Sequence, residues 1–532
     1  MRFTFSTWRV SIAALLTLAS IAVASTPPTD APLLAGFGDV HRPLSTNVAT
    51  AQIWYDQGFQ QAYAFDEAEA VRAFKAALKA DPACAMCAWG VAWQLGPNFN
   101  HPRHGDLSEA RRYALMAQQL LPASAASLER DLVAAMVTRY GSSDTPAALS
   151  PPAVADACGQ PAGSKGHPLD LAYARAVRML SDAYPTDADL QALNAEAELI
   201  ANPGPGYTPD TQKTLPRTAL LIDRIEASLR QHPRHTGLIH YFTHAADTPF
   251  DAARAVAIGA TLATLAPNAP HLVHMPSHLY VRLGRFADAA RTNQLALDAQ
   301  VRLSHSLEQQ GFSLLTDWNA HNRRFAWIAA QQGGDRITAM AQARQLAASA
   351  GSRTAEWPQF LRAMPLLTMA HFEEWRAIID ATKPGPDSAA LAPNVLAHAR
   401  GLALLRTGQD ADAEVQTLEQ QLAASRARGP DAKAGTAFAV MLLAPLKSEQ
   451  ALAKGDKVQA MAELRLALQA DADFTTPEPP LWAASAQRSL GQALLRMGDF
   501  AGAETAFRAD LRQLPANALS QQGLQQSLRG MK

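Results

Sequence analysis

Apolar and polar residues near the end of the chain recur with the spacing of two consecutive α-helices. In RSLGQALLRMGDFAGAETAFRADLRQLP, residues 488–515, apolar and small residues return three and four positions apart. Gly498 falls where the first helix should end, and Pro515 falls where the second should stop. The pattern therefore predicts a helix–turn–helix unit.

The same unit recurs along most of the chain. Near the start, six residues fit positions 4, 8, 20, 24, 27 and 32 of a repeat of about 34 residues. These residues are Trp54, Gly58, Ala70, Phe74, Ala77 and Pro82. Weaker copies bring the total to about seven units, and the spacing resembles that of the tetratricopeptide-repeat (TPR) family. The resemblance implies an all-α, TPR-type helical-repeat solenoid, and it implies no particular activity because such arrays serve many roles.

Two stretches rich in Gly and Pro interrupt this helical pattern, at residues 140–168 and 200–216. We expect them to be irregular insertions in the solenoid. The chain then divides into an N-terminal TPR-like region (49–139), the first insertion, central helical repeats (169–347) and C-terminal TPR-like repeats (348–532).

Residues 1–24 are typical of a secretory signal peptide, and the Pro- and Gly-rich residues 25–48 predict an extended lead-in. Arg2 and Arg9 precede or border an apolar run that ends in the small-x-small sequence Ala22-Val23-Ala24. The run is short for a membrane span, and no other segment is long and apolar enough to be one. We expect a periplasmic or secreted protein without a stable membrane span once the signal is removed.

The charge of the chain excludes a large electrostatic footprint for nucleic acid. Removal of the signal lowers the 47 basic residues to 45, against 48 acidic ones. The sequence also lacks a convincing GxSxG, Walker A, GxGxxG or HExxH pattern, which argues against the enzyme classes that these motifs mark.

Histidines recur in phase at the centre of the chain. His240 and His244 fall at positions 5 and 9 of one repeat, and His274 and His278 fall at the same positions of the next. A separation of four residues places both rings of a pair on one helix face. The TPR resemblance implies that this face lines a concave groove. The candidate groove residues are His240, Tyr241, His244, His271, His274, His278, Arg282, Arg285, His321 and Asn322.

Three interpretations of these histidines stay open. Imidazoles are good ligands for Zn²⁺ or Cu²⁺, and His240, His244, His274 and His278 would be the ligands, with Asp247, Tyr241 and Tyr280 as their partners. Alternatively, histidines together with Arg282 and Arg285 would grip a carboxylate of an organic or peptide ligand. The third interpretation is a set of hydrogen-bonded structural histidines.

Cys84 and Cys87 form a CxxC at the expected start of a helix. The residue after Cys87 is not the histidine that haem attachment needs, and two thiolates are too few for structural zinc. Export favours oxidation, so we expect a Cys84–Cys87 disulfide, with free buried thiols as the alternative. Cys158, in the first insertion, has no evident partner.

Several motifs resemble those of an exported bacterial subgroup of TPR proteins. They are DPACAMC ending at Cys87, LGPN at residues 95–98, HLVHMPSHLYVRLGR at residues 271–285, and His321-Asn322. The resemblance implies a shared site without an established activity. We expect an exported binding or scaffold protein, and not an enzyme, whose groove accepts a peptide, a protein segment or a small ligand, directly or through a metal. The alternative is a metal-dependent enzyme that uses the same histidines.

Overall fold

Helices make up nearly all the regular structure of the described part of the chain. A computed structural model describes residues 30–99, 106–140, 166–208, 213–429, 432–473 and 485–532. The expected signal peptide, nearly all of the first insertion, and Cys158 lie outside the described residues. In the described ranges no helix has both the length and the apolar character that a membrane span requires.

The helices and strands follow one another along the chain in three sets. The first set is α1 (Ala49–Tyr63), α2 (Glu67–Ala80), α3 (Ala85–Leu95), α4 (Ser108–Leu120), α5 (Ser127–Tyr140), α6 (Pro168–Ala183), α7 (Ala188–Ala201), β1 (Tyr207–Thr208), β2 (Lys213–Thr214) and α8 (Pro216–Leu229). The central set is α9 (Thr236–Ala245), α10 (Ala252–Gly259), α11 (Leu262–Leu265), α12 (Pro270–His274), α13 (Pro276–Arg282), α14 (Phe286–Gln309) and α15 (Asn319–Gln332). The last set is α16 (Arg336–Ser349), α17 (Glu356–His371), α18 (Trp375–Ala381), α19 (Pro386–Ala389), α20 (Pro393–Arg406), α21 (Asp412–Ala427), α22 (Lys433–Ala453), α23 (Lys457–Asp473), α24 (Ala486–Met497), α25 (Phe500–Gln513) and α26 (Ala518–Gly530).

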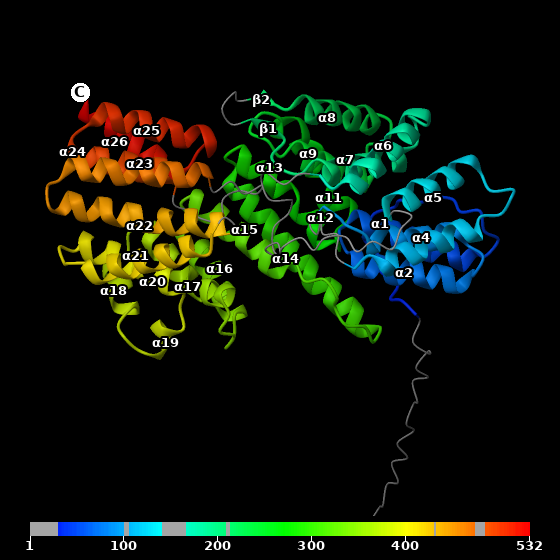
Figure 1. Cartoon of the computed structure of the whole chain (residues 1–532), viewed down its shortest axis with the longest axis horizontal. Coiled ribbons are helices and arrows are strands. Elements are labelled where there is room, and N and C mark those ends of the chain that lie inside the picture. The colour runs from blue at the N-terminus through cyan, green and yellow to red at the C-terminus, as the bar shows by residue number, and fades with distance from the viewer. Residues whose placement is uncertain (1–29, 100–105, 141–165, 209–212, 430–431, 474–484) are drawn as a thin grey trace, which may run out of the picture.

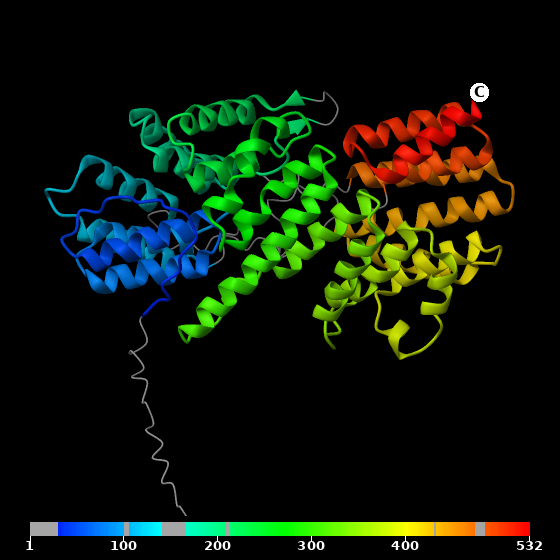
Figure 2. The same cartoon turned by 180° about the vertical axis from the view of Figure 1, so that it is seen from behind.

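These helices form a TPR-like solenoid in which each helix packs mainly on its neighbours in sequence. Figures 1 and 2 show the central helices α12 to α15 between the N-terminal helices and the C-terminal ones. The predicted all-α fold is therefore confirmed. The second expected insertion is partly regular, because β1 and β2 pair as a short antiparallel hairpin.

A phenylalanine wedged between two glycines sets the spacing of the repeats. A Cβ atom on Gly58 of α1 or on Gly90 of α3 would lie 2.6 or 2.5 Å from the ring of Phe74 on α2. Phe507 on α25 has the same relation to Gly491 of α24 and Gly523 of α26, at 2.8 and 2.3 Å. Both rings are fully buried. The small residues that the sequence pattern placed in the first helix of a unit therefore make room for an aromatic ring from the second.

The solenoid also contacts itself between repeats that are distant in sequence. The turn after α25 lies against the central helices, where a Cβ on Gly284 would meet the carbonyl oxygen of Pro515. In the same turn, Asn517 donates a hydrogen bond to Gln332 at the end of α15, across 185 residues of sequence. The C-terminal repeats therefore close back on the repeats that carry the histidines.

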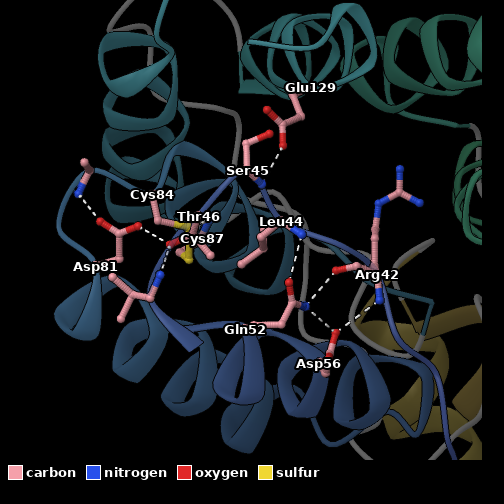
Figure 3. Close-up of a disulfide and its surroundings, with 12 residues drawn as sticks. Arg42, Leu44, Ser45, Thr46, Gln52, Asp56, Asp81, Cys84, Cys87 and Glu129 are labelled. Carbon is pink, nitrogen blue, oxygen red and sulfur yellow. Dashed lines mark hydrogen bonds between the residues drawn. A yellow bond between two sulfur atoms is a disulfide. The ribbon is translucent and has the colours of Figure 1, made fainter. Parts of the chain in front are cut away.

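The lead-in runs along the first repeats as an extended strap. Backbone N–H groups of Arg42 and Leu44 donate to Asp56 and Gln52 on α1, at 3.1 and 2.9 Å (Figure 3). Thr46 donates to Asp81, which precedes the Cys84–Cys87 disulfide at the start of α3. The disulfide is the pairing that the sequence indicated, and Cys84 is also the N-cap of α3, since its sulfur accepts a bond from the Cys87 N–H.

Replacing Gly58 by alanine should destabilise the protein by about 1–3 kcal/mol, because the added methyl group overlaps the trapped Phe74 ring. Chemical denaturation of purified variants measures this. Gly435→Ala, on α22, is the matched control, because the nearest atom to its added Cβ would be the Ser425 hydroxyl oxygen at 3.4 Å. Equal stability of the two variants would contradict the wedge.

Candidate metal centre

Six histidines from α9, from the α12–α13 segment and from α15 meet in the interior of the central repeats. They form two groups, which we call trio 1 (His240, His244 and His271) and trio 2 (His274, His278 and His321). In each trio the candidate ligand nitrogens lie within 4.8 Å of one another. Helix α9 supplies two members, α12 and α13 supply three, and α15 supplies the last.

A proline breaks the regular hydrogen bonding between α12 and α13. Pro276 has no N–H to donate, and the His278 N–H bonds instead to the carbonyl of Met275, three residues back. His271 precedes this tightened turn and joins trio 1, whereas His274 and His278 belong to trio 2.

The Nε2 atoms of each trio converge on one point. In trio 1, Nε2 of His240 lies 3.0 Å from Nε2 of His244 and 3.1 Å from Nε2 of His271. In trio 2, Nε2 of His274 lies 2.9 Å from Nε2 of His278 and 3.0 Å from Nε2 of His321. Each trio thus has a middle ring, His240 or His274, and two flanking rings.

The other ring nitrogens determine which Nε2 atoms carry lone pairs. Nδ1 of His240 lies 2.6 Å from the Tyr63 carbonyl, and Nδ1 of His278 lies 3.2 Å from a carboxylate oxygen of Asp247. Nδ1 of His274 lies 2.7 Å from Oδ1 of Asn293, whose amide nitrogen donates to the Ala289 carbonyl. Since these acceptors have no proton to give, the Nδ1 atoms are the donors, and the Nε2 atoms of neutral rings are bare.

With both rings neutral, two bare lone pairs would face each other at the 2.9 Å contact between His274 and His278. In trio 1, the single lone pair of His240 faces two nitrogens, although it can accept only one hydrogen bond. Neutral imidazoles alone do not satisfy either arrangement. A cation at the point where the Nε2 atoms converge satisfies both.

Burial favours the neutral, ligand-competent form of four of the six rings. Burial lowers the pKa of His240 to about 3, and it also lowers the pKa of His244, His271 and His274 well below the ordinary value. Burial alone would raise the pKa of Asp247, but Arg282 and His278 outweigh burial and hold that pKa at about 2. Asp247 is therefore a carboxylate that orients His278, as the partners of metal-bound histidines commonly do.

Aromatic rings enclose each trio. The Phe65 ring lies 4.3, 5.6 and 5.0 Å from the ring centroids of His240, His244 and His271. Phe325 lies 4.6, 4.5 and 5.0 Å from those of His274, His278 and His321. Trp318 packs on His271 and His321, one ring from each trio. This apolar wall is the reason that burial lowers the histidine pKa values.

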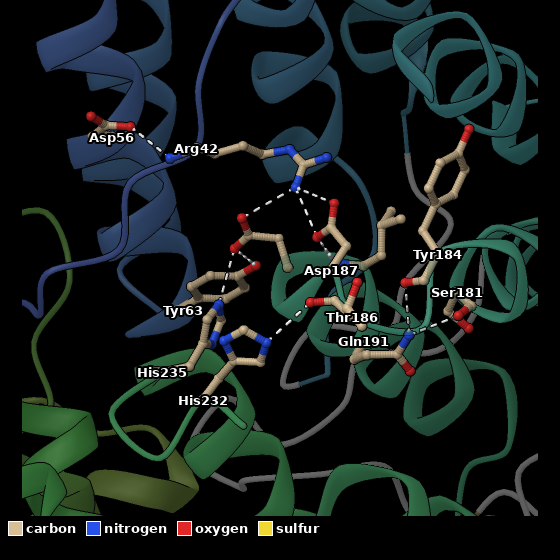
Figure 4. A network of polar contacts seen from close by, with 12 residues as sticks. Arg42, Asp56, Tyr63, Ser181, Tyr184, Thr186, Asp187, Gln191, His232 and His235 are labelled. Carbon is tan, nitrogen blue, oxygen red and sulfur yellow. Dashed lines mark hydrogen bonds and ion pairs between the residues drawn. The ribbon is translucent and has the colours of Figure 1, made fainter. Parts of the chain in front are cut away.

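A second polar network holds Tyr63 in place behind trio 1 (Figure 4). Asp189 accepts hydrogen bonds from the Tyr63 hydroxyl, at 2.9 Å, and from Arg42, at 3.2 Å. His235 is an acceptor at Nδ1 for the Leu238 N–H, so its Nε2 donates to Asp189 at 3.1 Å. The lead-in, α1, α7 and α9 thereby fix the carbonyl that orients His240.

One opening leads toward the trios. A pocket of about 80 Å³ is bordered by His244, Asp247, Arg282 and the turn before β1. His244 is the one partly exposed histidine of the six, since the other five are buried. Access from solvent is therefore on the side of His244.

The structure brings most of the predicted residues together, although it places them differently in detail. The four expected metal ligands are divided between the trios, and His271 and His321 complete them. Five of the six rings are buried, and only His244 borders a pocket, so the six do not line an open groove. Tyr241 stacks on His240 at 5.4 Å, and the Asn322 side chain is buried beside His321.

The two candidate arginines have other partners. Arg282 donates to Asp247 at 2.8 Å, and Arg285 lies over the Tyr280 ring and pairs with Asp288. Because both arginines already pair with carboxylates of this chain, they do not form the expected binding site for a ligand carboxylate. The sequence reasoning missed Tyr63, Phe65 and Asn293, which come from elements distant in sequence. Trp318 and Phe325 could have been found, because they lie three residues before and four after His321.

Comparison with known proteins finds similar helix arrangements and no family. No protein-family model and no curated protein matches the chain. Among solved structures, human IFIT1 with m7Gppp-AAAA has 12% identity and a TM-score of 0.33, over 92% of this chain and 91% of that one. The TPR domain of P58(IPK) has 13% identity and a TM-score of 0.22, over 91% and 98%. Yeast Tom70 has 10% identity and a TM-score of 0.26, over 90% and 88%. These likenesses concern the course of the helices alone.

The metal-free protein should lose stability as the pH falls from about 6.5 toward 3. In that range an unfolded chain protonates His240, whereas the folded chain, with a pKa of about 3 at this ring, does not. The loss should reach about 1.4 kcal/mol per pH unit for each such ring. Denaturant unfolding at a series of pH values, in the presence of a chelator, measures it.

The comparison variant is His240→Asn, which keeps a donor for Tyr63 and does not titrate. Burial raises the pKa of Asp66, Glu67 and Glu196 to about 6, 8 and 7, which stabilises the folded protein at low pH, and both proteins share this effect. The stability difference between wild type and variant should therefore shrink or reverse with acidification. Parallel pH curves would contradict the assignment of a buried neutral His240.

Proposed function

We propose that this chain is a metal-binding helical-repeat protein that holds one transition-metal ion in each histidine trio. The observation that carries the proposal is the convergence of three Nε2 atoms in each trio, while Nδ1 atoms are occupied by Tyr63, Asn293 and Asp247. Fixed tautomers with inward lone pairs are what a divalent ion requires of histidine ligands. Zn²⁺ and Cu²⁺ are the ions that sets of imidazoles suit best.

The number of ligands favours a centre that acts on a further molecule over a purely structural one. Structural zinc sites close their coordination with four protein ligands, whereas reactive sites supply three and leave a position open. Each trio supplies three. A metal-dependent enzyme, the alternative in the sequence analysis, is therefore the form of this proposal that the ligand set supports best, ahead of the binding or scaffold protein that the sequence favoured.

The other interpretations of the histidines have less support. Structural histidines should pair each donor with an acceptor, and in trio 1 the single lone pair of His240, which faces two ring nitrogens, does not allow this. A carboxylate ligand would need free cations near the rings, but Arg282 is bound to Asp247.

Export belongs to the same proposal. The signal-like residues 1–24 and the Cys84–Cys87 disulfide are consistent with a periplasmic or secreted protein. The motifs that resemble those of an exported bacterial TPR subgroup, CAMC and HLVHMPSH, include the two disulfide cysteines and three of the six trio histidines, His271, His274 and His278.

Binding of a protein or peptide partner is a second candidate function, and it would use another part of the molecule. A pocket of about 100 Å³ in the C-terminal repeats is bordered by His371, His398, Arg406, Arg488 and Trp375. The pocket also holds Glu373 and Glu449, and Glu449 pairs with Arg406, so aromatic, basic and acidic side chains together suit a peptide segment of mixed character. Such a partner would bind independently of the metal centre.

The purified protein should bind two metal ions per chain. His240→Ala removes the middle ligand of trio 1 and should leave one ion, and His274→Ala should do the same to trio 2. The double variant should bind none. Elemental analysis after dialysis against Zn²⁺ or Cu²⁺ measures the ratio. His398→Ala, which removes a buried histidine remote from both trios, should keep two. No bound metal in folded wild-type protein would refute the proposal.

Replacing Asn293 by alanine should weaken metal binding at trio 2 and leave the metal affinity of trio 1 unchanged. The Oδ1 atom of Asn293 orients His274, and loss of such a partner typically weakens metal affinity about 10–100-fold. Competition with a chromophoric chelator should show one weakened and one unchanged ion in Asn293→Ala. Weakening of both ions, or of neither, would show that the hydrogen bond does not set the affinity of trio 2.

A further inference from the structure

The shape of each trio distinguishes between metal geometries. In trio 1, the middle ring centroid of His240 lies 4.8 and 4.9 Å from those of His244 and His271, which lie 6.1 Å from each other. In trio 2, His274 lies 4.8 and 4.6 Å from His278 and His321, which lie 6.5 Å from each other. Both trios therefore have two short sides and one long side.

This shape fits a tetragonal ion better than a tetrahedral one. An imidazole centroid lies about 3.2 Å from an ion bound at the usual metal–nitrogen distance. Two rings bound at a right angle around the ion would then have centroids about 4.5 Å apart, and two rings on opposite sides of it about 6.4 Å. In tetrahedral coordination every pair of centroids would be about 5.2 Å apart. The short and long sides match a T-shaped set of three ligands. Tetragonal nitrogen coordination is typical of Cu²⁺, and tetrahedral coordination is typical of Zn²⁺.

The two trios lie next to each other. His271 of trio 1 lies 5.9 Å from the middle ring of trio 2, His274, and two pairs of flanking rings also face each other. His244 lies 6.2 Å from His278, and His271 lies 6.4 Å from His321, between ring centroids. In a T-shaped set the ion lies near the midpoint of the two flanking rings. The two ions would then be about 6 Å apart or less, with no backbone between them.

That spacing limits what can lie between the ions. At this upper limit the separation is larger than the distance of about 3.5–4 Å at which two-metal hydrolytic sites share a single bridging atom. A ligand of two or three atoms spans it, with one end on each ion.

The pocket beside His244 lies next to the space between the two trios. Its wall includes His244, a flanking ring of trio 1, and Asp247, which holds the His278 ring of trio 2. These are the two rings that face each other at 6.2 Å. Phe65 and Phe325 cover each trio elsewhere. The pocket therefore offers a small molecule a route to the space between the ions.

We propose that the two trios form one dinuclear copper centre, which binds a small ligand of two or three atoms end to end between the ions. This inference rests on the proposed metal binding, but it can fail separately from it. It states the metal, the relation of the two sites and the size of the molecule on which the centre acts.

Electron paramagnetic resonance of the copper(II)-loaded protein tests the pairing. Two Cu²⁺ ions about 6 Å apart interact through space, so the spectrum should be broadened and should contain a half-field transition. His240→Ala and His274→Ala, each loaded with one copper, should give the full signal of an isolated tetragonal ion without that transition. His305→Ala, which removes an exposed histidine that belongs to neither trio, should match the wild type.

Azide, a linear three-atom anion, tests the space between the ions. Added to the wild type, it should bind once per copper pair and abolish most of the paramagnetic signal, because a bridging ligand couples the two spins. In the single-trio variants azide should bind without loss of signal.

The outcomes separate the two proposals. Two copper ions per chain with independent spectra and no half-field transition would overturn the dinuclear centre and leave metal binding standing. Two azide ions per copper pair, with the signal retained, would overturn the bridged ligand. A tetrahedral copper(II) spectrum would overturn the assigned geometry. Absence of stoichiometric metal would overturn both proposals.

Discussion

The hydrogen bond from His240 to the Tyr63 carbonyl connects the histidine cluster to the rest of the molecule. A backbone carbonyl at the end of α1 cannot donate, so it sets the tautomer of the middle ring of trio 1. Asp189 in turn holds the Tyr63 side chain, and Arg42 of the lead-in and His235 of the α9 N-cap hold Asp189. The orientation of one ring thus depends on four segments, each fixed by its own packing.

The same logic governs trio 2, with different partners. Asn293 on α14 and Asp247 after α9 direct His274 and His278 toward a common point. The charge of Asp247 is balanced by Arg282, so a buried carboxylate is available to stabilise a bound cation without being left unpaired. Phe65 and Phe325 occupy equivalent places over the two trios, which gives the centre two similar halves built from unrelated segments of the chain.

The sequence was informative where the repeat geometry determines the structure. The repeat spacing is fixed because each phenylalanine ring must enter the gap that a glycine leaves, as in the pairs Gly58 with Phe74 and Gly491 with Phe507. Such a spacing can be recognised in the sequence. The pairing of Cys84 with Cys87 is also local. The division of the histidines into trios was not predictable in this way. His271 joins trio 1 and His274 joins trio 2 although one helix carries both, and the choice depends on Tyr63 and Asn293, which lie on other helices.

The contact between Asn517 and Gln332 has a consequence for how the chain is assembled. Helical repeats usually gain their structure from adjacent units, so that early repeats can fold while later ones are still absent. Here the last helix of the histidine centre, α15, ends at a residue whose partner lies 185 positions later. The final packing of the central repeats therefore includes a contact that exists only once the C-terminal repeats are in place, so the end of α15 is not completed by its neighbours in sequence alone.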